Sequence, residues 1–114
     1  MRAIAVEMKK AAAGQDEAWT TCVNTLLKLV GNVARAPGEE KFRRVRLGNP
    51  AVAARLGPWR EGAAALLELA GFRRAGAGAD EVLEMPEGGA DALVLAAAGE
   101  VLTSARDNAF FGVL

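Results

Sequence analysis

The chain has 114 residues, of which 52% are apolar and 25% carry charge, so it is long enough and apolar enough to bury one hydrophobic core. Its 14 basic residues equal its 14 acidic ones, which argues against a general attraction to nucleic acid or to an anionic membrane. It contains no histidine and one cysteine, Cys22, so the commonest general base and most sets of metal ligands are missing. The sequence therefore favours a single domain that is not an enzyme and holds no metal or cofactor.

The single cysteine and the N-terminal residues bear on the compartment. Cys22 cannot form an internal disulfide, which is typical of a reducing compartment. The N-terminus carries charges where a signal peptide would be apolar, and no apolar run reaches the roughly eighteen residues of a membrane span. We therefore expect a cytoplasmic or nucleocytoplasmic monomer that makes no contact with a membrane.

Two helices are expected before the first proline. Residues 3–13 have a helix-favouring composition but no continuous apolar stripe, so they form either a docking helix or a frayed end. Gly14 breaks the chain, Asp16 is expected to cap the next helix, and that helix should stop at Pro37-Gly38. Its apolar positions recur at helical spacing and are Trp19, Cys22, Val23, Leu26, Leu27, Val30 and Val33.

The middle of the chain is expected to hold a short strand between helical segments. Residues 39–42 predict one helical turn, and residues 44–47 alternate between polar and apolar, so their two arginines should face outward. Asn49-Pro50 predicts a helix start, since asparagine is a favourable N-cap and proline is tolerated at the first helical position. The helix that begins there should end at Gly57.

A further helix and two strands are expected next. Pro58 should begin a helix that closes at Gly71. Its apolar side is Ala63, Leu66, Leu67 and Ala70. Residues 72–74 and 82–85 flank a glycine-rich connection that suits a loose hairpin, and with residues 44–47 they predict a small antiparallel sheet.

The chain ends in a helix and an apolar tail. The helix should start near Asp91 and reach about Arg106. Its expected core face is Leu93, Val94, Ala97, Val101, Leu102 and Ala105. The tail contains Phe110 and Phe111, and it either folds back over the sheet or serves as a short linear motif. Packing is favoured because two exposed phenylalanines would be costly.

Together these elements predict an α+β fold, as a helix-rich single domain with a small three-stranded antiparallel sheet. Its parts are an N-terminal helical extension over residues 1–15, the domain itself over residues 16–107 and the apolar C-terminal tail over residues 108–114. Trp19 and Trp59 are expected in the core and not on a ligand platform.

A candidate binding site lies where the long helix ends and the basic strand begins. Leu29 and Asn32 are neighbours on one helix flank, and the strand that carries Arg46 leads directly to Asn49. If this strand packs against the helix end, a permanent cation and two amides converge around an apolar floor. Such a groove suits a short acidic peptide with an aromatic residue, bound with micromolar affinity. A basic surround would come from Lys41, Arg43 and Arg44.

This stretch also resembles a known family. Residues 32–49 match the pattern N-[IV]-x-x-x-P-x-[ED]-E-K-[FY]-R-x-[IV]-[KR]-[LI]-x-N, and further similarity continues from Asp16 to Arg106. The pattern is similar to that of the PUB domain, also called PUG. That domain is found in peptide:N-glycanases, in ubiquitin-regulatory-X adaptors and in the linear-ubiquitin ligase subunit.

The resemblance implies a partner and a site. PUB domains bind the C-terminal tail of valosin-containing protein, a hexameric AAA ATPase that extracts ubiquitinated proteins. Carried over by position, the family's pocket residues fall on Asn32, Arg46 and Asn49. Neighbouring pocket positions fall on Leu29, Gly48 and Ala51. Related domains commonly have tyrosine where Leu29 stands, so the resemblance implies weakened binding or a retuned preference for another short acidic, tyrosine-containing peptide.

Simpler interpretations stand beside this one. For Asn49, helix capping is about as good an explanation as ligand contact. Asn32 could instead help to end its helix, and Arg46 could be an ordinary solvated surface charge. Ubiquitin recognition is an alternative function, suggested by residues 69–72, which are similar to the loop of ubiquitin-associated domains. Nucleic-acid binding through the basic segment, including Arg35, is disfavoured because the sequence has no tyrosine and no interleaved aromatic platform.

Overall fold

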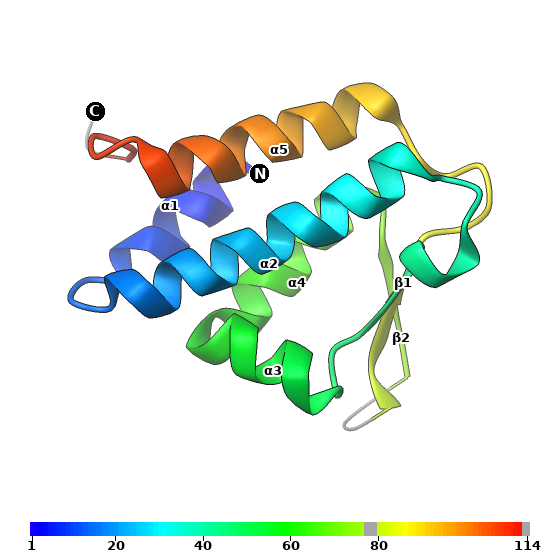
Figure 1. Ribbon diagram of the computed structural model, residues 1–114, viewed down its shortest axis with the longest axis horizontal. Coiled ribbons are helices and arrows are strands. Elements are labelled where there is room, and N and C mark those ends of the chain that lie inside the picture. Colours follow the sequence, from blue (N-terminus) through cyan, green and yellow to red (C-terminus); the bar gives the residue numbers. More distant parts are fainter. Residues whose placement is uncertain (77–79, 113–114) are drawn as a thin grey trace.

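The structure is a computed structural model that describes residues 1–76 and 80–112, in which a small sheet lies at one end of a group of packed helices (Figure 1). The elements are α1 (Arg2–Lys10), α2 (Asp16–Arg35), the 3-10 turn η1 (Glu40–Phe42), β1 (Arg44–Arg46), α3 (Pro50–Leu56), the 3-10 turn η2 (Gly57–Trp59), α4 (Arg60–Leu69), β2 (Arg73–Ala75), β3 (Val82–Glu84) and α5 (Ala92–Asp107). The three strands form one antiparallel sheet in the order β1-β3-β2. The predicted α+β class is confirmed.

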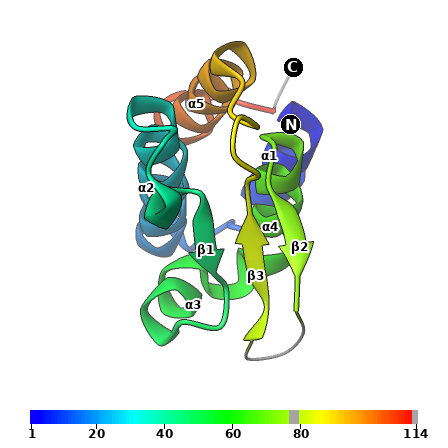
Figure 2. The same ribbon diagram turned by 90° about the vertical axis from the view of Figure 1, so that its right-hand side faces the viewer.

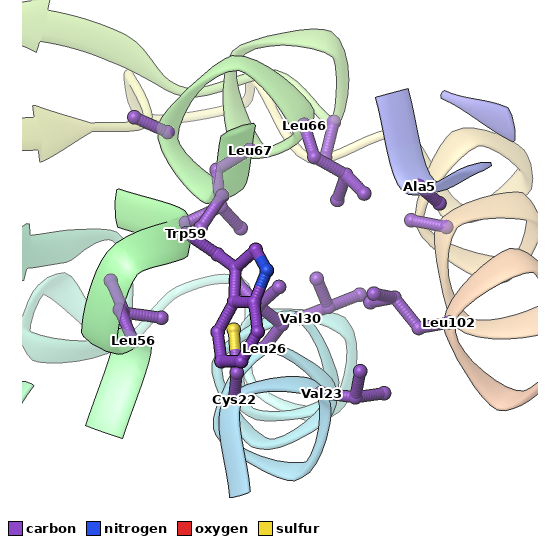
Figure 3. Packing of buried hydrophobic residues seen from close by; sticks show 14 of the residues in the cluster. Ala5, Cys22, Val23, Leu26, Val30, Leu56, Trp59, Leu66, Leu67 and Leu102 are labelled. Atoms are coloured by element: carbon purple, nitrogen blue, oxygen red, sulfur yellow. The ribbon is translucent and has the colours of Figure 1, made fainter. Parts of the chain in front are cut away.

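Helix α2 is the central element of the core. Its buried residues repeat every three or four positions, as an amphipathic helix requires, and are Trp19, Cys22, Val23, Leu26, Val30 and Val33. They pack against α5 on one side and α3 on the other. Figure 3 shows Leu26 of α2, Leu56 of α3 and Leu67 of α4 around the indole of Trp59. Burial raises the pKa of the Cys22 thiol to about 12, so this side chain acts as a small apolar residue.

The start of α2 differs from the prediction by one residue. Gln15 is the N-cap and its side chain makes no capping hydrogen bond. Asp16, the expected cap, lies in the first turn. A carboxylate in the first turn also stabilises the helix, through the helix dipole. An aspartate is therefore favourable both at the N-cap and in the first turn, so residue type alone does not tell which of the two Asp16 occupies.

The two tryptophans meet inside the core. The exposed fraction is 6% for Trp19 and 4% for Trp59, and their ring centroids lie 5.5 Å apart at an interplanar angle of 70°. This edge-to-face geometry is favourable. Trp19 Nε1 donates to the carbonyl oxygen of Ala105 at 3.3 Å and so links α2 to α5. Trp59 Nε1 is buried and has no acceptor among the described residues.

This difference predicts unequal effects of matched substitutions. Trp19→Phe should lower the free energy of unfolding by about 1 kcal/mol more than Trp59→Phe, because only the first removes a buried hydrogen bond. Both changes delete a similar volume. Urea denaturation of the two variants followed by circular dichroism measures the difference. Equal losses, or a larger loss for Trp59→Phe, would contradict the role given to the Trp19 indole.

The sheet has one face toward the helices and one toward solvent. Val45 of β1 lies opposite Leu83 of β3, and both are buried. Arg44 and Arg46, on either side of Val45, are exposed, as the alternation predicts. Figure 2 shows the three strands with α4 behind β2 and β3, and no helix in front of them.

The connection between α3 and α4 is tighter than predicted. Helix α3 ends at Leu56, as expected, and Gly57 follows with a positive φ of 57°. Pro58 does not begin α4 but lies within the 3-10 turn η2, and α4 starts at Arg60. This turn packs Trp59 against α2, where it is buried as expected.

Helix α1 belongs to the core, which confirms the first of its two expected forms. Ala5, Met8 and Ala12 are buried, and α1 contacts α4 and α5. The approach to α4 is close at Gly62, where an added Cβ would lie 2.7 Å from Met8 Cγ. A glycine at this position therefore lets the two helices meet.

The C-terminal tail packs on α1, so the expectation that it covers the sheet is wrong. Phe111 is 3% exposed, and the Arg2 guanidinium carbon lies 4.7 Å from its ring centroid. Lys9 Nζ donates to the carbonyl oxygen of Asn108 at 3.0 Å, which holds the tail against α1. Phe110 is 70% exposed, and residues 113–114 lie outside the described part.

The buried face of helix α5 matches the prediction only in part, at Leu102 and Ala105. Its buried residues are Leu95, Ala98, Leu102 and Ala105, whereas Leu93 is 83% exposed. Ala97 is also exposed. The helix is apolar on most sides, so spacing alone does not identify the face that meets α2. Within the described residues no helix is long and apolar enough to cross a membrane.

Candidate functional site

A tight turn joins the end of β1 to the start of α3. The backbone N–H of Asn49 donates to the carbonyl oxygen of Arg46 at 3.2 Å, which closes a turn through Leu47 and Gly48. Leu47 is fully buried, and its N–H donates to the carbonyl oxygen of Glu81 at 3.1 Å. The turn is thus anchored to the core and to the chain leading into β3. It fixes the backbone of Arg46 and Asn49 as close neighbours.

The side chain of Asn49 caps α3, as predicted. Its Oδ1 accepts from the N–H groups of Ala51 at 2.9 Å and Val52 at 3.4 Å. Because backbone N–H groups can only donate, this bonding assigns the oxygen to the helix and turns the NH2 group outward. Asn49 is exposed, so capping leaves it with two free donors at the surface.

Asn32 lies on the C-terminal part of α2 and also uses its oxygen internally. Its Oδ1 accepts from Nη2 of Arg35 at 2.7 Å. The helix end is satisfied by backbone alone, since Ala36 N donates to the Asn32 carbonyl oxygen at 3.0 Å. The side chain therefore has no part in ending the helix, and its NH2 group remains available to a ligand. Leu29, one turn earlier, is half-buried against the core and provides an apolar surface.

Arg35 is a site neighbour that the sequence interpretation of the pocket did not include. It is exposed and stands three residues after Asn32, so the two lie on the same face of α2. Its guanidinium passes beside Gly31, where a Cβ would come within 4.0 Å of Nη1. The three-residue spacing was the signal that could have identified it.

The candidate residues come from elements on one side of the molecule. Figure 2 shows β1 between the C-terminal part of α2 and α3. A backbone hydrogen bond links Arg46 and Asn49 across their turn. Among the described residues, no hydrogen bond connects the Asn32 side chain to that turn. Arg46 is exposed and has no ion pair within the described residues. Binding of a ligand by these residues stays a prediction.

The remaining candidate positions differ in their surroundings. Gly48 is half-buried within the turn, and Ala51 is exposed in the first turn of α3. Lys41 places its Nζ 5.2 Å from the ring centroid of Phe42. Of the basic surround, Arg43 and Arg44 line a separate cavity of about 480 Å³ on the sheet, beyond Arg46 along β1.

The chemistry of the site follows from its free groups. Asn32 and Asn49 offer NH2 donors, Arg46 offers a guanidinium, and the two amide oxygens are already bonded within the protein. Donors without competing acceptors suit carboxylates and backbone carbonyls. No group of three or more potential metal ligands occurs among residues 1–76 and 80–112.

In the turn at residues 69–72, which suggested ubiquitin recognition, two of the four residues are buried in the core. Ala70 is 1% exposed and Phe72 is 2% exposed, so both belong to the core. Gly71 adopts a positive φ of 118°, and Leu69 alone presents an apolar side chain, at 52% exposure. The glycine-rich connection between β2 and β3 falls partly on residues 77–79, which lie outside the described residues.

Comparison with known proteins gives one match. The family model described as the PUB domain matches residues 16–98, from the start of α2 into the first half of α5. This range contains every candidate site residue, whereas α1 and the tail lie outside it. No curated protein and no solved structure matches the chain.

Proposed function

The chain belongs to the PUB domain family, and on this basis we propose that it binds the C-terminal tail of valosin-containing protein. PUB domains are protein-interaction modules and not catalytic units. In this proposal the protein is an adaptor that connects the AAA ATPase to ubiquitin-dependent degradation. The proposal implies a cytoplasmic or nucleocytoplasmic location, in line with the expectation from the charged N-terminus and the single cysteine.

The observation that carries the proposal is the donor-only character of the site. Arg46 makes no ion pair among the described residues, and the oxygens of Asn32 and Asn49 are bonded within the protein. A guanidinium can hold a carboxylate in a bidentate pair, and two amide donors can hold the carbonyls of an extended peptide. An acidic peptide segment therefore finds partners here, whereas a basic peptide would meet only like-charged or donor groups.

Leu29 is where this chain departs from the usual family pattern. The side chain is half-buried against the core, so it contributes apolar surface but neither an aromatic wall nor a hydroxyl. Contacts of this small extent give affinities near micromolar at best. We therefore propose weak binding of the ATPase tail, and as the alternative partner another short acidic peptide that contains tyrosine.

Isothermal titration calorimetry with a synthetic peptide of the ATPase's last ten residues tests the function. The expected result is one site with a dissociation constant on the order of ten micromolar. A peptide of the same composition in scrambled order is the control for simple charge attraction. If neither peptide releases heat with the folded protein, the proposed partner is wrong. Equal binding of both peptides would also reject a specific tail site.

Asn49→Asp separates the two roles of this residue. Aspartate is also a good N-cap, so α3 should keep its cap and the melting temperature should stay unchanged. The substitution replaces the outward NH2 donors by a carboxylate oxygen, which repels an acidic ligand. We expect peptide affinity to fall about tenfold, or ~1.4 kcal/mol.

The control for this prediction is Asn49→Ala, which removes the cap as well as the donors. It should lower the free energy of unfolding by about 1 kcal/mol in addition to weakening binding. Unchanged peptide affinity in Asn49→Asp would show that Asn49 serves only as a cap.

A further inference from the structure

The solvent face of the sheet carries a row of charged side chains in register. Arg44 of β1 and Arg73 of β2 both lie opposite Glu84 of the central strand β3. The three residues line the cavity of about 480 Å³, whose mouth also includes Arg43 and Glu40. No helix covers this face in Figure 2. The cavity is thus an open surface feature with more basic than acidic side chains.

Neighbouring Arg74 differs from Arg73 because its charge is already neutralised within the protein. Arg74 lies opposite the buried Leu83, so it faces α4, and there its Nη1 meets Glu61 Oε1 at 2.8 Å. Its Nε also pairs with Glu68. The hydrogen bond from Arg74 lowers the pKa of Glu61 below its ordinary value, as expected for an ion pair. Arg74 is therefore committed to holding β2 on α4.

Arg73 has no such partner. It is exposed, and among the described residues its side chain makes no ion pair and no hydrogen bond. Arg44 meets Glu84 at 3.1 Å, but both side chains are about half exposed, and such a surface pair is weak enough to exchange for another carboxylate. Arg43 has one long bond, from Nη1 to the Met85 carbonyl oxygen at 3.4 Å. Unused donor capacity is therefore concentrated on this face.

The cavity and the candidate site adjoin the same strand, β1. Arg46 and Arg44 are two residues apart and share the outward face of the strand. Two residues along a strand and two strands across a sheet put Arg46 and Arg73 about 12 Å apart, which an extended peptide spans with about four residues. Val82 and Ala75, both half-buried, form an apolar surface between them.

We propose that the sheet face is a second subsite of the peptide site, and that it binds carboxylates of the same peptide three or four residues from the part held at Arg46. The occupant is an acidic segment because the cavity lining carries Arg43, Arg44 and Arg73 against Glu40 and Glu84, while the fourth arginine, Arg74, is already paired with Glu61 and Glu68. Arg73 is the principal contact. Arg44 adds a second contact when it exchanges its ion pair with Glu84 for a carboxylate of the peptide. This subsite rests on the proposed function, since the peptide is anchored by Asn32, Arg46 and Asn49.

A cycle of protein and peptide changes tests the subsite with the full chain. The probe is a synthetic ten-residue peptide with a C-terminal aromatic residue preceded by aspartates. A second peptide, the neutralised peptide, has the same sequence but carries asparagine in place of the aspartates three and four residues before the aromatic residue. Arg73→Gln should weaken binding of the acidic peptide about three- to fivefold and leave binding of the neutralised peptide unchanged. Arg55→Gln, an exposed arginine on α3, is the control and should change neither.

The outcomes distinguish this subsite from the proposed function. If Arg73→Gln binds the acidic peptide as tightly as the wild type while Arg46→Glu does not, the subsite is wrong and the anchor stands. If the wild type binds neither peptide, both proposals are overturned. Tight binding of a generic oligonucleotide that is lost in Arg73→Gln would assign the face to nucleic acid and overturn the peptide subsite.

Discussion

Arg46→Glu should strongly weaken binding of the ATPase tail peptide. The Arg46 guanidinium is a permanent cation with no ion pair among the described residues, and glutamate there would repel an acidic peptide and accept the amide donors of Asn32 and Asn49 itself. We expect at least about a tenfold loss of affinity, corresponding to ~1.4 kcal/mol or more. Calorimetric titration of wild type and variant measures it.

The control for this charge reversal is Arg55→Glu. Arg55 is exposed on α3 and undergoes the same change in net charge outside the candidate site. Its peptide affinity should stay within about twofold of the wild type at 0.15 M salt, where distant surface charges are screened. Arg46 is exposed, so Arg46→Glu should keep its melting temperature. If both variants lose binding equally, Arg46 contributes only general charge and the site is elsewhere.

Gly76→Ala should be among the most damaging single substitutions in the sheet. Gly76 follows β2 with a positive φ of 73°, a region that alanine occupies only with strain. An added Cβ would also collide with the backbone carbonyl oxygen of Asp80, which cannot move without disturbing the entry to β3. We expect the free energy of unfolding to fall by ~3 kcal/mol, measured by urea denaturation.

Gly88→Ala is the matched control, because it isolates the backbone strain from the collision. Gly88 has a positive φ of 75° and nothing within 4 Å of the position of an added Cβ. Its substitution should therefore lower the free energy of unfolding by only ~1 kcal/mol. Similar losses for the two variants would mean that the contact with Asp80 relaxes freely and that strain alone determines the cost.

Local patterns predicted the elements of the fold well where the residue types alternate clearly. The spacing in α2, the alternation around Val45 and the cap at Asn49 each depend on near neighbours in the chain, and each is found as expected. In helix α5 the predicted core positions Leu102 and Ala105 are buried, but Leu93 and Ala97 are exposed, because the helix is apolar on most sides and contact with α2 selects the buried face. The tail failed for the same reason, since only the position of α1 gives Phe111 a surface to cover.

The sequence and its family resemblance proposed Asn32, Arg46 and Asn49 as site residues, and their role in binding stays a prediction. The sequence did not predict that the side-chain oxygens of both asparagines accept hydrogen bonds within the protein. That property depends on side-chain conformation. The approach of Arg73 to Arg44 was also beyond the sequence, because it follows from the strand order β1-β3-β2 and the register of three short strands.

The strand order also has a consequence for how the chain acquires its site during synthesis. Within the part of the chain that the structure describes, β1 pairs only with β3, and α3, η2, α4 and β2 all lie between them along the chain. The loop that this pairing closes is long, so its entropic cost is met only after those helices have packed. Arg46 and Asn49 precede β3 along the chain, yet the edge that holds them stays unpaired until β3 has emerged. We therefore expect peptide binding to be among the last properties gained as the nascent chain folds.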